Sequence, residues 1–268
     1  MTNPEPGGSP STIDTTTAHS ARIWDWLLGG KDHYAVDREV GEAICRMSPA
    51  LPRTAREDRA FLRRAVDYLV REAGIRQFLD IGTGLPTADN THEVAQRLAP
   101  DARVVYVDND PVVLAHAKAL LVGASPGTTA YLDADLRDPD TILREAAKTL
   151  DFTRPIAIML LGIVHFIPSD DEAHAIIEHL LNSVPSGSHL ALVHITAVFE
   201  PEAKRAEVQH WNEHGKPNTL TIRTPEQIEG LFRGLDILPP GIVPTPLWRP
   251  DIADAPPVDG FCGVGSKP

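Results

Sequence analysis

One stretch of nine residues constrains the fold of this chain more than any other. Residues 78–86 read FLDIGTGLP, an apolar run that ends at Asp80 and is followed by glycines at positions 82 and 84. A second apolar run, RVVYV at residues 103–107, ends directly before Asp108. Glycines let a backbone approach a ligand closely, and an acid at the end of the neighbouring strand is suited to ribose hydroxyls. The two runs therefore predict the first two strands of a nucleoside-binding α/β sheet.

The chain beyond this point alternates between apolar segments and helical patterns. We expect strands at residues 77–81, 103–107, 128–132, 155–161 and 189–195, followed by two late strands at 235–243 and 261–266. We expect helices between and after them at residues 88–98, 111–122, 139–150, 170–182 and 202–213, and from Pro225. Alternation of this kind predicts a parallel sheet with helices on both faces.

Three helical segments are expected ahead of the first strand, at residues 21–28, 35–47 and 53–72. The arginines of the third segment are interleaved with acids, which is typical of a solvated helix face with pairs four residues apart. The first residues have neither an apolar core nor a basic start, and so do not resemble a secretory signal. The predicted organisation is a disordered tail at 1–16, an N-terminal helical segment or lid at 17–76, and a core at 77–268.

The net charge and the residue composition indicate which kinds of binding partner are disfavoured. The formal net charge of −12 disfavours binding to phosphate backbones, so we expect no nucleic-acid partner. No apolar run approaches the roughly 20 residues needed to cross a bilayer, so we expect no membrane association. Cys45 and Cys262 form neither a disulfide framework nor a metal-binding pattern, which fits a cytoplasmic protein. His210 and His214 have a spacing that chelates metals on helices, but we expect a surface pair and no metal site.

The residues around the two glycines distinguish between two cofactors. The dinucleotide fingerprint has a third glycine in G-x-G-x-x-G, whereas Leu85, Pro86 and Thr87 follow here. Dehydrogenases also usually have a small or apolar residue where Asp80 stands, which disfavours a nicotinamide-dependent oxidoreductase. The pattern resembles instead the first motif of class I S-adenosylmethionine-dependent methyltransferases. S-adenosylmethionine has no pyrophosphate to bind at a helix N-terminus, and its amino group and sulfonium suit a nearby carboxylate.

The resemblance covers nearly the whole chain from about residue 17. Residues 21–34 (ARIWDWLLGGKDHY), 248–250 (WRP) and 260–267 (GFCGVGSK) resemble a bacterial S-adenosylmethionine-dependent methyltransferase family long described as being of unknown function. That family implies an α/β, Rossmann-like class I methyltransferase fold. Its sheet has seven strands and is mostly parallel with the last strand antiparallel, and N-terminal helices form a lid. The resemblance does not imply a known methyl acceptor.

The resemblance also assigns positions to the cofactor. Those at or just after the ends of the first three strands are Asp80, Gly82, Thr83, Gly84, Asp108, Asn109, Asp135 and Leu136. Asp108 would contact the ribose, and Asp135 would contact the adenine amino group with Leu136 beside the ring. In the lid, Arg22 or Lys31 would meet the cofactor carboxylate, and Tyr34 would close over the methionyl chain.

His165 is the best candidate for the chemistry, because it follows the fourth expected strand beside the topological switch point. It is expected to act as a base or acceptor contact, with a structural role under the cofactor as the alternative. Residues 200–220 follow the fifth strand and are expected to cover the acceptor pocket. The predicted function is methyl transfer from S-adenosylmethionine to a small-molecule acceptor, with S-adenosylhomocysteine as product. A non-catalytic S-adenosylmethionine-binding regulatory protein is the alternative, because no clear acceptor-activating motif follows strand four.

Overall fold

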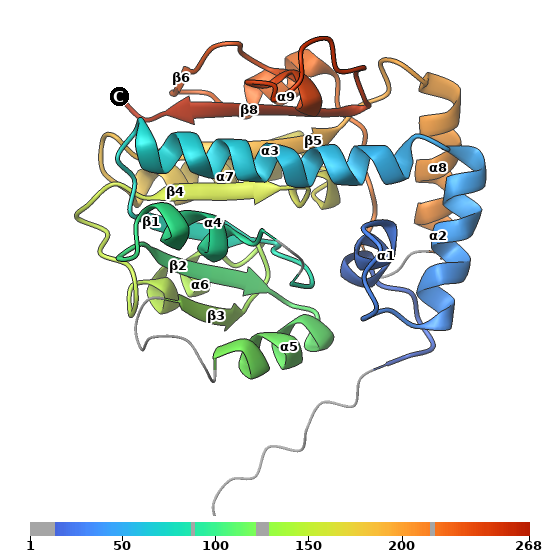
Figure 1. Ribbon diagram of the computed structural model, residues 1–268, viewed down its shortest axis with the longest axis horizontal. Coiled ribbons are helices and arrows are strands. Elements are labelled where there is room, and N and C mark those ends of the chain that lie inside the picture. Colours follow the sequence, from blue (N-terminus) through green and yellow to red (C-terminus); the bar gives the residue numbers. More distant parts are fainter. Residues whose placement is uncertain (1–13, 87–88, 122–128, 215–217) are drawn as a thin grey trace, which may run out of the picture.

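The computed structural model describes residues 14–86, 89–121, 129–214 and 218–268, so most of the predicted disordered tail lies outside the described residues. A sheet lies between two layers of helices (Figure 1). The strands are β1 (Gln77–Ile81), β2 (Arg103–Asp108), β3 (Thr129–Asp133), β4 (Ala157–Leu161), β5 (His189–Ile195), β6 (Asp236–Ile237), β7 (Val243–Pro244) and β8 (Gly260–Ser266). The helices are α1 (Ser20–Leu27), α2 (Ala35–Met47), α3 (Leu51–Arg71), α4 (Thr91–Leu98), α5 (Pro111–Leu121), α6 (Pro139–Ala146), α7 (Asp170–Asn182), α8 (Pro201–His214) and α9 (Pro225–Gly230), with 3-10 turns η1 (Val164–Phe166) and η2 (Thr245–Leu247).

The strand order is β3-β2-β1-β4-β5-β8-β6, and β7 also pairs with β8. Strands β1 to β5 are parallel, and β8 runs antiparallel to β5. This is the predicted class I methyltransferase arrangement. The chain reverses its direction of travel across the sheet between β3 and β4, which sit on opposite sides of β1. Such a reversal leaves a crevice at the carboxyl ends of the central strands, where ligands bind in open α/β sheets.

The expected strand at residues 235–243 is wrong as a single element. Two short strands, β6 and β7, pair with β8 instead, and the described sheet therefore has eight strands rather than seven. Pro239, Pro240 and Gly241 lie between them. A proline has no N–H to donate to a strand ladder, so consecutive prolines interrupt the pairing.

Apolar side chains fill both faces of the sheet. On one face α3 and α4 pack through a cluster that includes Phe61, Leu69 and the fully buried Trp248. On the other face α6, α7 and α9 pack through a cluster that includes Ile142 and Phe232. The central strands are buried along nearly their whole length, as expected for parallel strands covered on both sides.

The arginines of α3 do not all lie on a solvated face. Arg71 makes the predicted pair with Asp67, at 2.9 Å. Arg64, in contrast, is buried, and its guanidinium donates to the carbonyl oxygens of Trp248 at 2.9 Å and Thr245 at 2.7 Å. The prediction of a solvated face is therefore wrong for Arg64, which ties α3 to the segment before β8.

Three helices gather beyond the carboxyl ends of the parallel strands, where Figure 1 shows α1, α2 and α8 at the right of the molecule. They share an apolar cluster that includes Ile23, Ile44, Leu51, Phe166 and Trp211. Helix α3 belongs to the expected lid segment by sequence, but most of its length packs on the sheet. None of the helices among the described residues has the combined length and apolar character that crossing a bilayer requires.

Candidate functional site

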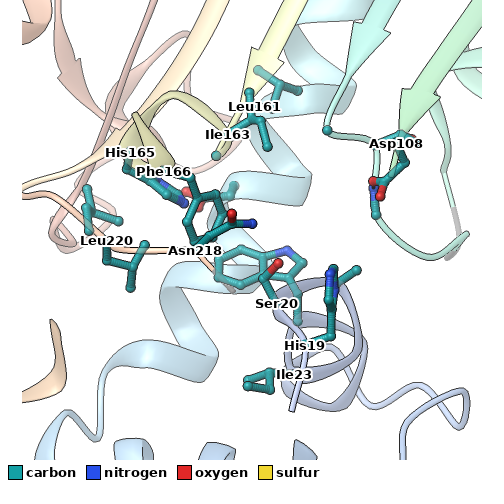
Figure 2. A pocket seen from close by; sticks show the side chains of 18 of the residues that line it. His19, Ser20, Ile23, Asp108, Leu161, Ile163, His165, Phe166, Asn218 and Leu220 are labelled. Carbon is teal, nitrogen blue, oxygen red and sulfur yellow. Dashed lines mark hydrogen bonds between the residues drawn. The ribbon is translucent and has the colours of Figure 1, made fainter. Parts of the chain in front are cut away.

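A cavity lies at the carboxyl ends of the parallel strands, where the sheet order reverses (Figure 2). The loops after β1, β2, β3 and β4 form one side, and α1, the first half of α3 and α8 form the other. In Figure 2, Asp108 lies on one flank and His165 with Leu220 on the opposite flank. All the predicted cofactor positions at or just after the ends of the first three strands line this cavity, and so does His165.

The glycine turn after β1 has a backbone that side chains would disturb. Gly82 and Gly84 adopt φ angles of 76° and 66°, which residues other than glycine rarely adopt. A Cβ atom at Gly82 would lie 2.7 Å from the side chain of Ile163, whereas one at Gly84 would meet no atom within 4 Å. The turn is also tied to β2, because the N–H of Gly82 donates to the carbonyl oxygen of Val107 at 2.8 Å. Position 82 therefore requires glycine because a side chain there would collide with Ile163. At position 84 the backbone faces the cavity without a side chain.

Asp108 holds the same turn from the end of β2. Its Oδ2 accepts the backbone N–H of Gly84 at 2.8 Å, and its Oδ1 accepts that of Asp110 at 2.9 Å. Burial raises the pKa of this carboxyl. Farther along the sheet edge, Asp135 accepts a hydrogen bond from the side-chain amide of Asn109 at 3.2 Å. A hydrogen bond therefore connects the predicted cofactor residues after β2 with those after β3, along the same edge of the sheet.

Asp80 lies beneath the glycine turn as a buried acid. Its Oδ2 accepts the hydroxyl of Thr91 at 2.6 Å. Burial raises the pKa of Asp80 to about 6, although the nearby charge of Arg59 acts in the opposite direction. Arg59 lines the cavity from α3 and donates to Oδ1 of Asn90 at 3.2 Å. The charges of Asp80 and Arg59 therefore act on each other at the wall of the cavity.

Sequence reasoning missed Arg59 because it was grouped with the solvated arginines of α3. A signal was present in the helical spacing. Residue 59 follows the buried Ala55 by four positions and precedes the buried Leu62 by three, so it lies on the inward stripe of the helix.

Arg22 and Tyr34 lie outside the residues that line the cavity. The buried guanidinium of Arg22 donates to the backbone oxygens of Asp14 and Thr17, both at 3.0 Å, and lies 5.3 Å from the centre of the Tyr34 ring. It also lies 3.7 Å from a carboxylate oxygen of Asp37. Arg22 and Tyr34, which were both predicted to contact the cofactor, thus have contacts with residues of the N-terminal segment.

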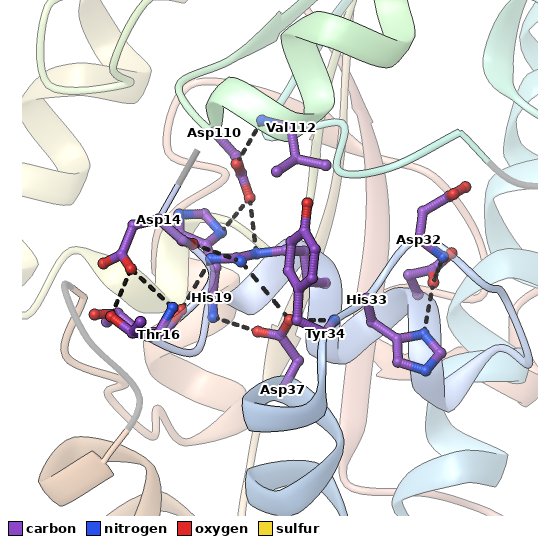
Figure 3. Close-up of polar contacts among 12 residues, drawn as sticks. Asp14, Thr16, His19, Asp32, His33, Tyr34, Asp37, Asp110 and Val112 are labelled. Carbon is purple, nitrogen blue, oxygen red and sulfur yellow. Dashed lines mark hydrogen bonds and ion pairs between the residues drawn. The ribbon is translucent and has the colours of Figure 1, made fainter. Parts of the chain in front are cut away.

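The same segment is tied to the loop after β2 by a group that we call the lid latch, consisting of His19, Arg22, Asp37 and Asp110 (Figure 3). Nδ1 of His19 lies 2.8 Å from Oδ2 of Asp110, and the backbone N–H of His19 donates to Asp37 at 2.9 Å. Burial by itself raises the pKa of Asp110, but the contact with His19 outweighs burial and holds that pKa below its usual range. Asp110 is therefore ionised at neutral pH and fixes α1 over the cavity.

His165 projects from η1, directly after β4. Its side chain is buried, and its Nδ1 has no hydrogen-bond partner among the described residues. The ring meets Phe166 at 4.5 Å and His194 at 5.7 Å between centroids. Burial lowers the pKa of His165 well below its usual value, and His194 and Arg223 act in the same direction. The imidazole is therefore neutral at pH 7.

Helix α8 and the segment after it line the cavity beyond His165, through residues that include Lys204, Glu207, Trp211 and Leu220. Nζ of Lys204 donates to Glu207 at 2.7 Å, and both side chains are buried. Residues 200–220 were expected here from their place after the fifth strand. The buried ion pair was not expected, because a lysine and a glutamate three positions apart usually indicate an exposed helix face.

The comparisons with known proteins identify the family. A family model described as S-adenosyl methyltransferase matches residues 6–268. The chain belongs to that family. The methyl donor of this S-adenosyl methyltransferase is S-adenosylmethionine.

Solved structures agree with this assignment. A DUF574 family protein from Streptomyces avermitilis MA-4680 is 46% identical, with 96% of this chain and 100% of that chain covered and a TM-score of 0.91. A protein from Thermobifida fusca YX, described as a candidate methyltransferase, is 41% identical, with 94% and 95% covered and a TM-score of 0.85. Human N-acetylserotonin methyltransferase in complex with S-adenosylmethionine is 13% identical, with 93% and 63% covered and a TM-score of 0.51, and shares the fold. The search of curated proteins found no match.

The lid latch leads to a prediction about local stability. Asp110→Asn keeps an oxygen for the N–H of Val112 but removes the charge that faces His19 and Arg22. Losing a charged, partly buried contact costs roughly 1.5–3 kcal/mol, so amide exchange in α1 should accelerate by about tenfold or more. Hydrogen–deuterium exchange of residues 20–27 measures this. Asp32→Asn, which removes an exposed acid 3.7 Å from His116, is the matched control. Equal exchange in the two variants would contradict the latch.

Proposed function

We propose that this S-adenosyl methyltransferase acts in the cytoplasm and transfers the methyl group to a small-molecule acceptor bound in the cavity at the carboxyl ends of the strands. The observation that carries the proposal is the continuity of the cavity. Its walls include the predicted cofactor positions after β1, β2 and β3, and they continue past His165 to Lys204 and Trp211 on α8. One space can thus hold donor and acceptor together. The net charge of −12 disfavours a nucleic acid as the acceptor.

The residues of the cavity fit S-adenosylmethionine. We assign its binding to Asp80, Gly82, Thr83, Gly84, Asp108, Asn109, Asp135 and Leu136, and add Arg59. The pair formed by Asp80 and Arg59 complements the ammonium and carboxylate of the methionyl group. The half-buried carboxylate of Asp108 suits the ribose hydroxyls, and Asp135 suits the adenine amino group. Arg22 and Tyr34 are left out of this set, because neither lines the cavity and the guanidinium of Arg22 lies among Asp14, Thr17, Asp37 and Asp110.

When bound, S-adenosylmethionine supplies a methyl group that its sulfonium has already activated for in-line displacement. The protein therefore has to position the acceptor, exclude water and receive a proton where the acceptor loses one. Neutral His165 lines the cavity and is suited to a hydrogen bond with the acceptor. Helices α1 and α8 close the side opposite the strand ends and limit the access of water.

A binding experiment tests the choice of cofactor. S-adenosylhomocysteine should stabilise the protein against heat and NAD should not, with a gain of about 2.7 kcal/mol at a hundredfold excess over Kd. Asp108→Ala should abolish the shift, because it removes both the ribose acceptor and the anchor of the Gly84 N–H. Asp101→Ala, at an exposed aspartate, is the control. Stabilisation by NAD alone would exclude the proposal, and an unchanged shift in Asp108→Ala would place the ribose contact elsewhere.

The raised pKa of Asp80 predicts a pH dependence of cofactor binding. Above a pH of about 6 the carboxyl is ionised and attracts the cofactor ammonium, and below it the carboxyl is protonated and the attraction is lost. The Kd for S-adenosylhomocysteine, measured by calorimetry, should therefore rise as the pH falls through 6. Asp80→Asn should weaken binding about tenfold at pH 7.5 and flatten the dependence. A wild-type affinity that is constant from pH 7.5 to 5 would remove the ammonium contact from Asp80.

Turnover distinguishes an enzyme from a regulatory protein that only binds S-adenosylmethionine. With the small-molecule fraction of a cell extract, the wild-type protein should produce S-adenosylhomocysteine. His165→Ala should slow this about a hundredfold, the usual scale for a positioned base, without changing the Kd for S-adenosylhomocysteine. His174→Ala is the control, since Nε2 of His174 is also buried without a partner among the described residues but does not line the cavity. Equal rates in the two variants would remove the role of His165.

A further inference from the structure

The turn that carries His165 has its backbone oxygens bonded to donors from other parts of the chain. The turn comprises η1 and Ile167, and all of its residues are buried. The oxygen of His165 accepts the backbone N–H of Thr221 at 2.8 Å, and that of Phe166 accepts the guanidinium of Arg137 at 2.7 Å. Buried carbonyl groups need such partners. Residues outside the turn therefore set the position of His165 at the cavity wall.

Arg223 supplies the other two of these hydrogen bonds. Its Nη1 donates to the oxygen of Val164 at 3.3 Å, and its Nη2 donates to that of Ile167 at 2.8 Å. The Arg223 side chain is 1% exposed, and its Nε donates at 2.8 Å to Oδ1 of Asp170, the first residue of α7. Because a guanidinium presents its donors in a fixed planar arrangement, these contacts fix the backbone on both sides of His165 relative to α7.

The same guanidinium holds the ring on which His165 packs. Nη1 of Arg223 lies 2.7 Å from Nε2 of His194, and Nδ1 of His194 lies 2.9 Å from the oxygen of Ile195. Because an arginine can only donate and a carbonyl oxygen can only accept, His194 carries its proton on Nδ1 and accepts at Nε2. Burial lowers the pKa of His194 to about 3, which keeps the ring in this neutral form. The rings of His194 and His165 meet edge to face, with 5.7 Å between centroids and 83° between planes.

Arg223 and His194 lie behind the cavity wall. The described residues that line the cavity include His165 but neither Arg223 nor His194. Burying a guanidinium costs free energy even where it is paired. Of the four acceptors of Arg223, two are oxygens of the turn and a third is the His194 ring against which His165 packs. The contacts of this buried charge thus converge on the placement of one imidazole.

We propose that Arg223 is a positioning residue for methyl transfer, which holds the turn after β4 and the ring of His194 so that the imidazole of His165 keeps a fixed place at the cavity wall. This inference rests on the proposed function, since that function gives His165 the contact with the acceptor. Arg223 itself contacts neither cofactor nor acceptor. Its effect on the rate therefore depends on the presence of His165, whereas a contact that only stabilises the fold acts equally with and without His165.

A double-mutant cycle on the full-length protein tests this dependence. Arg223→Lys keeps the positive charge but replaces the planar guanidinium with a single nitrogen, which cannot make the same contacts together. With S-adenosylmethionine and the small-molecule fraction of a cell extract, it should slow the production of S-adenosylhomocysteine about tenfold or more. In the His165→Ala background the same change should alter the rate by less than about twofold. The Kd for S-adenosylhomocysteine should stay within about twofold of the wild-type value throughout, which shows that the variants are folded.

Arg64→Lys is the matched control for the loss of a buried arginine. Arg64 also donates to two backbone oxygens, in the segment before β8, so its replacement should change the rate by the same factor with and without His165. An Arg223→Lys variant that slows both backgrounds equally, or slows neither, would overturn the inference.

A milder variant decides the question where Arg223→Lys does not fold. Asp170→Ala removes a half-exposed partner of Arg223 and should slow turnover only while His165 is present. Asp171→Ala, at the exposed acid next to it, should leave the rate unchanged. Equal rates in Asp170→Ala and Asp171→Ala would count against the positioning role.

Histidine NMR gives a readout that does not depend on turnover. In protein with 15N-labelled histidine, the ring signal of His165 is the one that disappears in His165→Ala. Arg223→Lys should shift or split this signal, and Arg64→Lys should leave it in place. An unchanged His165 signal in Arg223→Lys would overturn the inference even without detectable turnover. Equal rates in His165→Ala and the wild type would instead overturn the role of His165 in the proposed function, and the NMR signal would still show whether Arg223 fixes the imidazole.

Discussion

The geometry of the cavity depends on one hydrogen bond between the ends of two neighbouring strands. The carboxylate of Asp108, at the end of β2, accepts the N–H of Gly84 in the turn that follows β1. The parallel register of β1 and β2 brings the two strand ends to the same edge, and the bond then fixes the turn with its bare backbone toward the cavity. The carboxylate that organises the turn is also the one assigned to the ribose. Asp108 therefore both stabilises the fold and is assigned a contact with the cofactor.

The residues at the carboxyl ends of β1, β2 and β3 could be predicted, because the sequence pattern that indicates them is local. The alternation of apolar segments and helices predicted the order of the elements, and the acid and glycines after β1 predicted where the ligand site would lie. Asp108, Asn109 and Asp135 could be located from the ends of their strands, since parallel strands deliver these ends to one place. The pair of prolines and the glycine at 239–241 were underestimated in the sequence analysis, because the apolar character of the segment was given more weight than the missing N–H donors of the prolines.

The other wall of the cavity was harder to predict, because tertiary packing and not the local pattern determines it. Arg59, Lys204 and Glu207 have side chains that usually face solvent, and only the packing of α3 and α8 against the strand ends buries Lys204 and Glu207 and half-buries Arg59. Arg22 shows a second limit of the sequence. The signature segment suggested a ligand contact, and the structure adds that two guanidinium nitrogens of Arg22 donate to the backbone oxygens of residues 14 and 17. Hydrogen bonds of that kind leave no trace in residue spacing.

The lid latch has a consequence for the order in which the molecule is assembled. His19 and Arg22 are made early in synthesis, but their partner Asp110 follows β2, so the wall over the cavity cannot close until that strand has emerged and paired. Contacts between segments far apart in the sequence form slowly, because a long loop must be closed before they stabilise the chain. The cavity is therefore enclosed by α1 only when β2 and the loop that carries Asp110 are in place.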